Sequence, residues 1–227
     1  MYYRFFSIVL LLCAAWALSA SPITYDISVN TSSISGTSGS LDFQFNPGPL
    51  VSQAASLQIL SFLSNGTLSA SPTLTGDVSG GLPGTLTFDN GTGLNDYFQG
   101  FTYGSTLSFS VKLFGPALSS PDGISTSGSR FAFSMFSDAG GTVPALTSDT
   151  ANGFAFTTDV NLDGTTTVTK SSRQTSILPE GAAVPEPASF GLAAAALIIL
   201  ALKALWVPSG HRRTSLAAAD IAAAFPR

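Results

Sequence analysis

Leu41-Asp42-Phe43-Gln44-Phe45 and Phe131-Ala132-Phe133-Ser134-Met135-Phe136 are the two stretches that decide the fold of this chain. A large apolar residue occupies every second position in both, which is the pattern of a β-strand with one buried face. Phenylalanine is expected to supply the core, where burying one ring contributes roughly 1.5–3 kcal/mol. We expect these phenylalanines to point inward: Phe43, Phe45, Phe109, Phe131, Phe133, Phe154 and Phe156.

The same alternation recurs along much of the chain, between turn-forming pairs such as Asn90-Gly91 and Asp163-Gly164. Further strands are predicted over residues 23–29, 57–62, 66–74, 85–88, 107–113, 153–158 and 165–169. No sustained helical period interrupts them between residues 21 and 175. The pattern therefore predicts an all-β fold, an antiparallel β-sandwich or jelly-roll-like domain over residues 21–170.

The segment 95–104, Asn-Asp-Tyr-Phe-Gln-Gly-Phe-Thr-Tyr-Gly, has two interpretations. Its closely spaced rings and amides are typical of a sugar-binding loop, since flat rings stack on sugar faces. Equally, Tyr97 and Tyr103 are apolar enough in their bodies to pack inside the domain. We favour the core interpretation, because both tryptophans, Trp16 and Trp206, lie outside the domain.

The first twenty residues have the features of a secretory signal peptide. Arg4 supplies a positive start, residues 5–12 are mostly apolar, and small residues follow up to Ala20. The apolar run is too short for a membrane span. The chain is therefore expected to be exported, with residues 1–20 removed.

A second apolar segment, residues 190–207, is long enough to cross a bilayer as a helix of about 27 Å. Lys203, Arg212 and Arg213 all lie at or beyond its end, and this bias places the C-terminal side in the cytoplasm. We therefore expect a single-pass membrane protein with the β-domain outside. Residues 171–183 are interpreted as a linker and residues 214–227 as a cytoplasmic tail.

The charge of the exported part argues against nucleic acid as a partner. Residues 21–183 carry eleven acidic residues against four basic ones, a net charge of −7. Binding to a phosphate backbone requires a basic face.

The catalytic inventory of the exported part is also small. The only histidine is His211 and the only cysteine is Cys13, so neither residue type is present between 21 and 183. This excludes Ser-His-Asp and Cys-His chemistry there and leaves only paired carboxylates. The candidates are Asp42, Asp96, Asp138 and Asp149, and their spacing does not indicate which of them pair. We expect no enzyme.

Asp159-Val160-Asn161-Leu162-Asp163-Gly164 matches the first half of an EF-hand-type calcium loop, with oxygen ligands at positions 1, 3 and 5. Position 12 should be a glutamate, and it is Lys170. The flanking sequences also predict strands instead of helices. We favour a β-hairpin that turns at Asp163-Gly164, and keep calcium at Asp159, Asn161 and Asp163 as a minor hypothesis.

Val184-Pro185-Glu186-Pro187, followed by the apolar segment 190–207 and by Arg212 and Arg213, resembles the PEP-CTERM sorting signal of Gram-negative bacteria. The resemblance covers residues 184–213. It implies recognition by an exosortase, a membrane-embedded transpeptidase-like enzyme, then removal of the span and delivery to the envelope or exopolysaccharide matrix. Residues 46–48, 95–101 and 163–169 also resemble segments of a family of small PEP-CTERM proteins without an assigned activity.

These features together predict an exported, membrane-tethered surface or extracellular-matrix protein with a structural or adhesive role. Its expected partners are the secretion machinery, an exosortase, the membrane and exopolysaccharide. One alternative is a surface module that binds polysaccharide or calcium, and a weaker one is a hydrolase.

Overall fold

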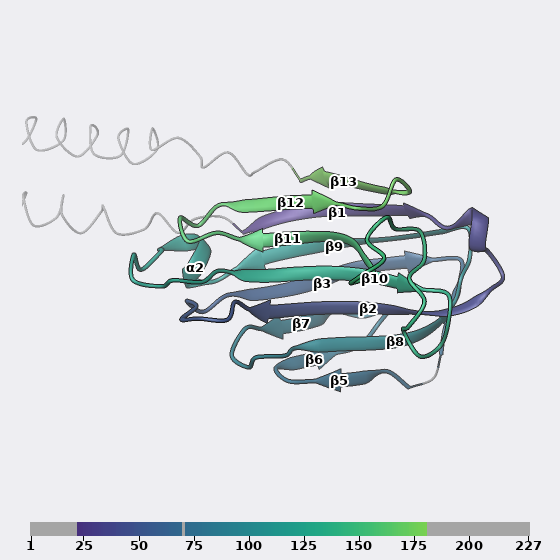
Figure 1. The fold of residues 1–227 in the computed structure, drawn as a ribbon, viewed down its shortest axis with the longest axis horizontal. Coiled ribbons are helices and arrows are strands. Elements are labelled where there is room, and N and C mark those ends of the chain that lie inside the picture. Colours follow the sequence, from purple (N-terminus) through teal and green to yellow (C-terminus); the bar gives the residue numbers. More distant parts are fainter. Residues whose placement is uncertain (1–21, 70, 181–227) are drawn as a thin grey trace, which may run out of the picture. The chain divides into compact units, whose positions relative to one another are not determined.

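Residues 22–69 and 71–180, which the computed structural model describes, form thirteen strands and two very short helices, so the predicted all-β fold is confirmed. The strands build two antiparallel sheets that run lengthwise through this part of the chain (Figure 1). The helices are η2 (Ser32–Ile34) and α2 (Pro116–Ser119).

Sheet A contains six strands. In spatial order they are β13 (Thr175–Pro179), β1 (Ile23–Asn30), β9 (Thr106–Phe114), β3 (Ser56–Ser64), β7 (Leu86–Asp89) and β6 (Val78–Gly80). Within this sheet, β1 pairs with β9 along its whole length, with Ile23 opposite Leu113 and Asn30 opposite Thr106.

Sheet B contains seven strands. In spatial order they are β12 (Thr166–Lys170), β11 (Phe154–Val160), β10 (Ser129–Phe136), β2 (Ser38–Pro47), β8 (Asp96–Thr102) and β4 (Thr67–Leu68), with β5 (Thr73–Thr75) also paired to β8. The single strand predicted over 66–74 is therefore wrong, because β4 and β5 are separate pairings on β8.

The core lies between the sheets and is built mainly from phenylalanine. The rings of Phe43 from sheet B and Phe109 from sheet A meet edge-to-face, with centroids 5.3 Å apart, and Phe133 lies 5.0 Å from Phe109. Such contacts add to the free energy of burial. Six of the seven predicted phenylalanines are at most 2% exposed, which confirms them as core: Phe43, Phe45, Phe109, Phe131, Phe133 and Phe156.

Phe154 is the exception, and the prediction that it points inward is wrong. Phe133 of β10 is opposite Phe156, but the next residue, Ser134, is opposite Phe154. A β-bulge at this point leaves Ala155 as an extra residue, which moves Phe154 to the opposite phase of the strand. Phe154 therefore lies on the outer face of sheet B, where it is partly exposed.

The aromatic segment 95–104 is mostly strand β8, and the core interpretation is confirmed for three of its four rings, whereas Phe98 is only partly buried. Tyr97 is fully buried, and Phe101 and Tyr103 are 2% exposed. The hydroxyl of Tyr103 lies 2.8 Å from the carbonyl oxygen of Ser40 and 3.0 Å from that of Phe136. Burial raises the pKa of Tyr103, so the phenol keeps its proton and donates it to these carbonyls.

Residues 175–179 are not linker, as the sequence suggested, but strand β13 at the edge of sheet A. Tyr25 is opposite Pro179 and Val29 is opposite Thr175, and the N–H of Glu180 donates to the carbonyl of Thr24 at 2.9 Å. The sequence Thr-Ser-Ile-Leu-Pro lacks a clear strand pattern because Ile177 is its only apolar residue that packs against the core. β1 therefore begins, and β13 ends, at the same end of the sandwich (Figure 1).

Within residues 22–69 and 71–180, no helix is long and apolar enough to cross a membrane. The predicted signal peptide at 1–20 and the segments at 184–213 and 214–227 lie outside the described residues.

Candidate functional site

An open groove of about 530 Å³ crosses the outer face of sheet B, the face turned away from sheet A. Its floor consists of side chains on the outward phase of three adjacent strands: Gln44 and Asn46 of β2, Arg130 and Ala132 of β10, and Phe154 and Asp159 of β11. They point outward because their strand neighbours fill the core. In each strand the outward-pointing residues line the groove, and the inward-pointing apolar residues between them form the core.

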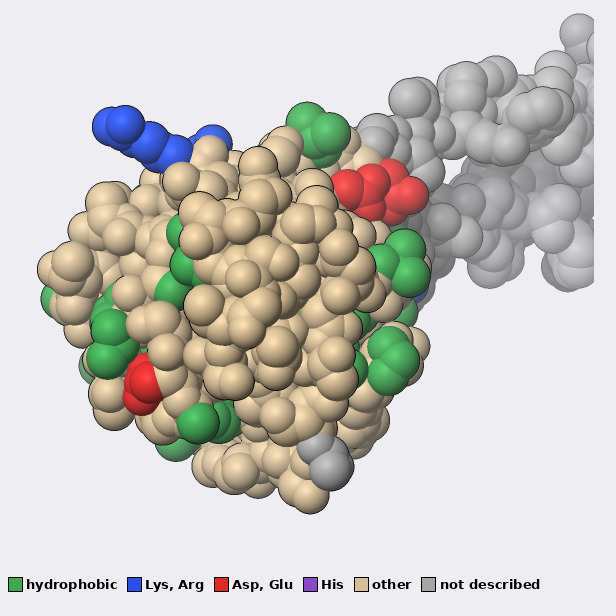
Figure 2. Space-filling model, turned by 90° about the vertical axis from the view of Figure 1, so that its right-hand side faces the viewer, with side chains coloured by type: hydrophobic (Ala, Val, Ile, Leu, Met, Phe, Trp, Pro, Cys, Tyr) green, Lys and Arg blue, Asp and Glu red, His purple; other side chains and the backbone are tan. Residues whose placement is uncertain are grey.

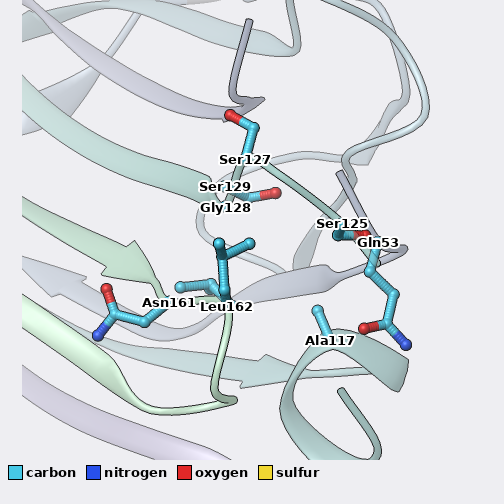
Figure 3. Close-up of a pocket in the computed structure, with 9 residues that line it drawn as sticks. Gln53, Ala117, Ser125, Ser127, Gly128, Ser129, Asn161 and Leu162 are labelled. Atoms are coloured by element: carbon cyan, nitrogen blue, oxygen red, sulfur yellow. The ribbon is translucent and has the colours of Figure 1, made fainter. Parts of the chain in front are cut away.

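The groove continues at one end into a much smaller hollow of about 10 Å³, room for about one water molecule. Figure 3 shows this hollow, with Asn161 and Leu162 of the β11–β12 hairpin on one side and Gln53, Ser125 and Ala117 on the other. The stretch Ser127-Gly128-Ser129 lines both spaces. The rim therefore combines hydroxyl, amide and backbone groups with the apolar side chains of Ala117 and Leu162.

Arg130 and Asp159 form an ion pair across β10 and β11. Arg130 Nε donates to Asp159 Oδ1 at 2.6 Å and Nη2 to Oδ2 at 3.1 Å. The carboxylate raises the pKa of Arg130 and holds the guanidinium against the sheet. Two of the five guanidinium N–H groups are used in this way, which leaves three for other partners.

A chain of amides runs along β2 from the groove toward a buried acid. Asn46 accepts the N–H of Asn95 at 2.6 Å and its amide lies 3.4 Å from Gln44 Oε1. Gln44 Nε2 in turn donates to Asp42 Oδ2 at 2.8 Å. These contacts fix the orientation of the groove amides.

The structure brings together two of the four candidate carboxylates. Asp42 of β2 and Asp96 of β8 are close enough for their carboxyl groups to share a hydrogen bond. Burial, and then the neighbouring Asp96, raise the pKa of Asp42 to about 9, so Asp42 is protonated at neutral pH. Within the described part of the chain, Oδ1 of each residue has no hydrogen-bond partner.

This pair is not placed to act on a molecule in the groove. Asp42 is only 8% exposed, and neither Asp42 Oδ1 nor Asp96 Oδ1 has significant accessible surface. The segment after β10 covers this region, since Ser40 Oγ donates to the carbonyl of Asp138 at 2.9 Å. A general acid must reach the atom that it protonates, and this acid does not.

The other two candidates, Asp138 and Asp149, cap turns of their own. Asp138 Oδ1 accepts the N–H groups of Thr142 at 2.9 Å and Val143 at 2.8 Å. Asp149 accepts the N–H of Asn152 at 3.0 Å. Backbone donors lower the pKa of both residues, as expected of ionised turn caps.

The calcium motif forms the predicted β-hairpin. The N–H of Asn161 donates to the carbonyl of Thr165, and Gly164 has φ +82° at the turn, a conformation that favours glycine. Asp163 Oδ1 accepts the N–H of Thr165 at 3.0 Å, whereas Asp159 binds Arg130. Asn161 Nδ2 donates to the hydroxyls of Thr165 and Thr167, each at 3.0 Å. Asn161 and Asp163 therefore share Thr165 as a partner, whereas Asp159 is paired elsewhere.

No three acidic, histidine or cysteine side chains gather to hold a metal among the residues that the structure describes. The predicted sorting residues Val184, Pro185, Glu186 and Pro187, and the basic residues Lys203, Arg212 and Arg213, lie outside that part of the chain.

Sequence reasoning named Asp42 and Asp96 but not their pairing, and it did not identify Gln44, Asn46, Arg130 or Phe154 as groove residues. The available signal was the polar phase of the predicted strands, because outward residues of neighbouring strands share one face. Comparisons with known protein families, with curated proteins and with solved structures find no match.

Proposed function

We propose that this protein is an exported, non-enzymatic surface or matrix protein whose β-sandwich is delivered and tethered by its two terminal segments. One observation carries the proposal: the sandwich closes where the sorting segment is about to begin. β13 completes sheet A at Pro179, only a few residues before Val184-Pro185-Glu186-Pro187. The sorting motif is therefore not required for the core, and an enzyme can process it without unfolding the domain.

In this proposal residues 1–20 direct export and residues 190–207 span the membrane, with Lys203, Arg212 and Arg213 on the cytoplasmic side. An exosortase then removes the span, and the domain passes to the envelope or the exopolysaccharide matrix of a Gram-negative bacterium. The chain crosses between the sheets from β1 to β2 and from β2 to β3, as the strands of a sandwich domain do.

The test of sorting is a deletion of Pro185, Glu186 and Pro187 in a strain that carries an exosortase. The variant should stay in the membrane fraction, while the wild type is released. Deletion of the three preceding residues, Gly181, Ala182 and Ala183, is the matched control and should be released normally. Unchanged release of the motif deletion would contradict the proposal.

The absence of enzymatic activity is supported by the burial of Asp42 and of Asp96 Oδ1. Asp42 and Asp96 are the one pair of candidate acids brought together in the described chain. Turnover of a polysaccharide that disappears in Asp96→Asn would restore the hydrolase alternative.

The groove on sheet B favours a second role, binding of a polysaccharide strand. The groove offers planar hydrogen-bond donors and acceptors beside the ring of Phe154. They belong to Arg130, Asp159, Gln44 and Asn46. Their charges cancel within the ion pair, which suits a neutral sugar. On a glycan array, Arg130→Ala and Phe154→Ala should weaken binding at least fivefold. Lys112→Ala removes an equal charge from β9 of sheet A and should not. Absence of any saturable ligand would leave the structural role alone.

Calcium stays the minor alternative. If the hairpin binds it, the melting temperature should rise with calcium and fall with EDTA, and Asp163→Asn should abolish both shifts. An unchanged melting temperature would end this hypothesis.

A further inference from the structure

Large exposed apolar side chains are concentrated at the end of the sandwich that carries α2. This tether end comprises the connections after β2, β7, α2 and β11, and the end of β13, and Figure 1 shows them on the same side of the molecule. Six of the nine large apolar residues that are exposed in the described chain belong to it: Leu50, Val51, Leu94, Ile124, Leu162 and Leu178. Ile124 is 78% exposed, and Leu50 and Val51 are each 66% exposed.

The opposite end has a different surface. Figure 2 faces that end and shows mostly uncharged polar side chains and backbone, with only scattered apolar and charged groups. Leu63 and Val143 are exposed there, at 68% and 52%, but they belong to separate elements, β3 and the loop after β10. The asymmetry between the two ends is therefore a property of the loops.

The apolar loops of the tether end are held in place by backbone contacts. The N–H groups of Thr126 and Ser127 donate to the carbonyl of Val51 at 2.9 and 3.0 Å. Gln53 Nε2 donates to the carbonyl of Ser120 at 2.9 Å. Leu50, Val51 and Ile124 are thus presented by one connected surface, and little conformational entropy is lost when it meets a partner.

The charge of this end restricts the partner. Asp122, Asp163 and Glu180 are exposed there, and the connecting loops 48–55, 115–128 and 161–165 contain no lysine or arginine. An anionic surface would be repelled. A zwitterionic lipid surface accepts apolar side chains at its interface without that penalty.

The chain beyond the described residues brings such a surface within reach. Phe190, where the predicted span starts, is ten positions after Glu180. Ten extended residues reach at most about 35 Å. A tethered domain therefore keeps this end near the bilayer, at a high effective concentration.

We propose that the tether end docks on a zwitterionic lipid surface through Leu50, Val51, Ile124 and Leu162, so that the domain stands on the membrane with a fixed orientation until it is processed. The inference rests on the proposed membrane tether. It adds that the sandwich itself, and not only the C-terminal segment, contacts lipid.

The test uses the full chain, reconstituted into phosphatidylcholine vesicles through its own C-terminal segment. In a Cys13→Ser background, single cysteines replace Ile124 or Leu162 at the tether end, and Leu63 or Val143 at the opposite end as matched exposed controls. Each carries an environment-sensitive fluorophore, and nitroxide-labelled phosphatidylcholine is the quencher. Labels at 124 and 162 should be quenched at least twofold more than labels at 63 and 143. Replacing a third of the lipid by phosphatidylglycerol should reduce the difference.

Equal quenching at both ends would overturn the inference. So would energy transfer between copies labelled at position 124 without lipid quenching, since it assigns the surface to a second copy of the chain. The tether is checked separately: a chain that an alkaline wash removes from the vesicles contradicts the proposed function, whereas a retained chain with unquenched labels contradicts this inference alone.

Discussion

Asp42 on β2 and Asp96 on β8 lie diagonally across two neighbouring strands, Asp42 opposite Phe98 and Asp96 opposite Gln44, so that their carboxyl groups share the outer face of sheet B. Each has an Oδ1 without a hydrogen-bond partner in the described chain. Holding a proton on a buried acid at neutral pH costs folding free energy, because the unfolded chain would release it. This cost in folding free energy arises at Asp42, so a substitution at that residue should remove it.

Stability is expected to fall as the pH rises from about 4 to about 9. Burial raises the pKa of Asp42 from its ordinary value of 3.8 to about 9 in the folded state, so the folded state binds the extra proton throughout this range. The free energy of unfolding should decrease by up to about 1.4 kcal/mol per pH unit within it. Asp42→Asn, whose amide is neutral and can donate to Asp96, should flatten this dependence and raise stability at pH 8. Urea unfolding of a fragment comprising residues 22–180 at several pH values measures both effects.

Asp163→Asn is the control for that experiment. Asp163 is exposed, and hydrogen bonds from Thr165 lower its pKa, so its contribution is lost only in acid. Between pH 5 and pH 8, the slope of the free energy of unfolding against pH should be the same in this variant as in the wild type. A flat wild-type profile over that interval would show that Asp42 is ionised in the folded protein.

The strands were predictable because their side chains alternate, but the contacts between strands were not. Asp42, Gln44 and Asn46 fall on the polar phase of a strand that the sequence identifies, so their outward orientation follows from it. Which residue of β8 lies beside them depends on register, and a one-residue slip moves every side chain to the other face. The bulge that turns Phe154 outward arises from the pairing of β10 with β11. The sequence around Phe154 alternates like that of a regular strand, so the bulge could not be predicted from it. The acid pair and the groove also depend on the register between strands, so neither could be predicted from the sequence.

The hairpin turn at Gly164 packs against the chain around α2, and glycine substitutions can measure this contact. Gly164 and Gly36 both have φ +82°, so alanine strains the backbone equally at both. An added Cβ at Gly36 meets nothing within 4 Å, whereas at Gly164 it lies 2.9 Å from Pro121 Cγ and 3.0 Å from the carbonyl oxygen of Leu118. Gly36→Ala should cost about 1 kcal/mol of unfolding free energy and Gly164→Ala about 1 kcal/mol more. Equal losses in chemical unfolding would place the hairpin away from α2.

Phenylalanine truncations test the division between core and groove. Phe43 is fully buried and contacts Phe109, Phe133 and Tyr97. Phe43→Ala should lower the free energy of unfolding by about 3–5 kcal/mol, because it leaves a cavity between the sheets. Phe154→Ala removes the same atoms from the outer face and should cost about 1 kcal/mol or less. Similar losses for the two variants, measured in one urea series, would return Phe154 to the core.

Chain truncation decides between a linker and a strand at residues 175–179. A fragment that ends at Ser172 loses β13, and with it the packing of Ile177 and the pairing that covers Ile27 and Val29 at the edge of sheet A. Burial of one such side chain is worth roughly 1.5–3 kcal/mol, so we expect a loss of at least about 2 kcal/mol relative to a fragment that ends at Glu180. A fragment that ends at Ala183 adds three residues beyond the last hydrogen bond to β1 and should match the Glu180 fragment. Both tryptophans lie outside all three fragments, so far-ultraviolet circular dichroism is the suitable probe of unfolding. Three coincident transitions would mean that sheet A is complete at β1, and that the chain leaves the sandwich before it reaches residue 175.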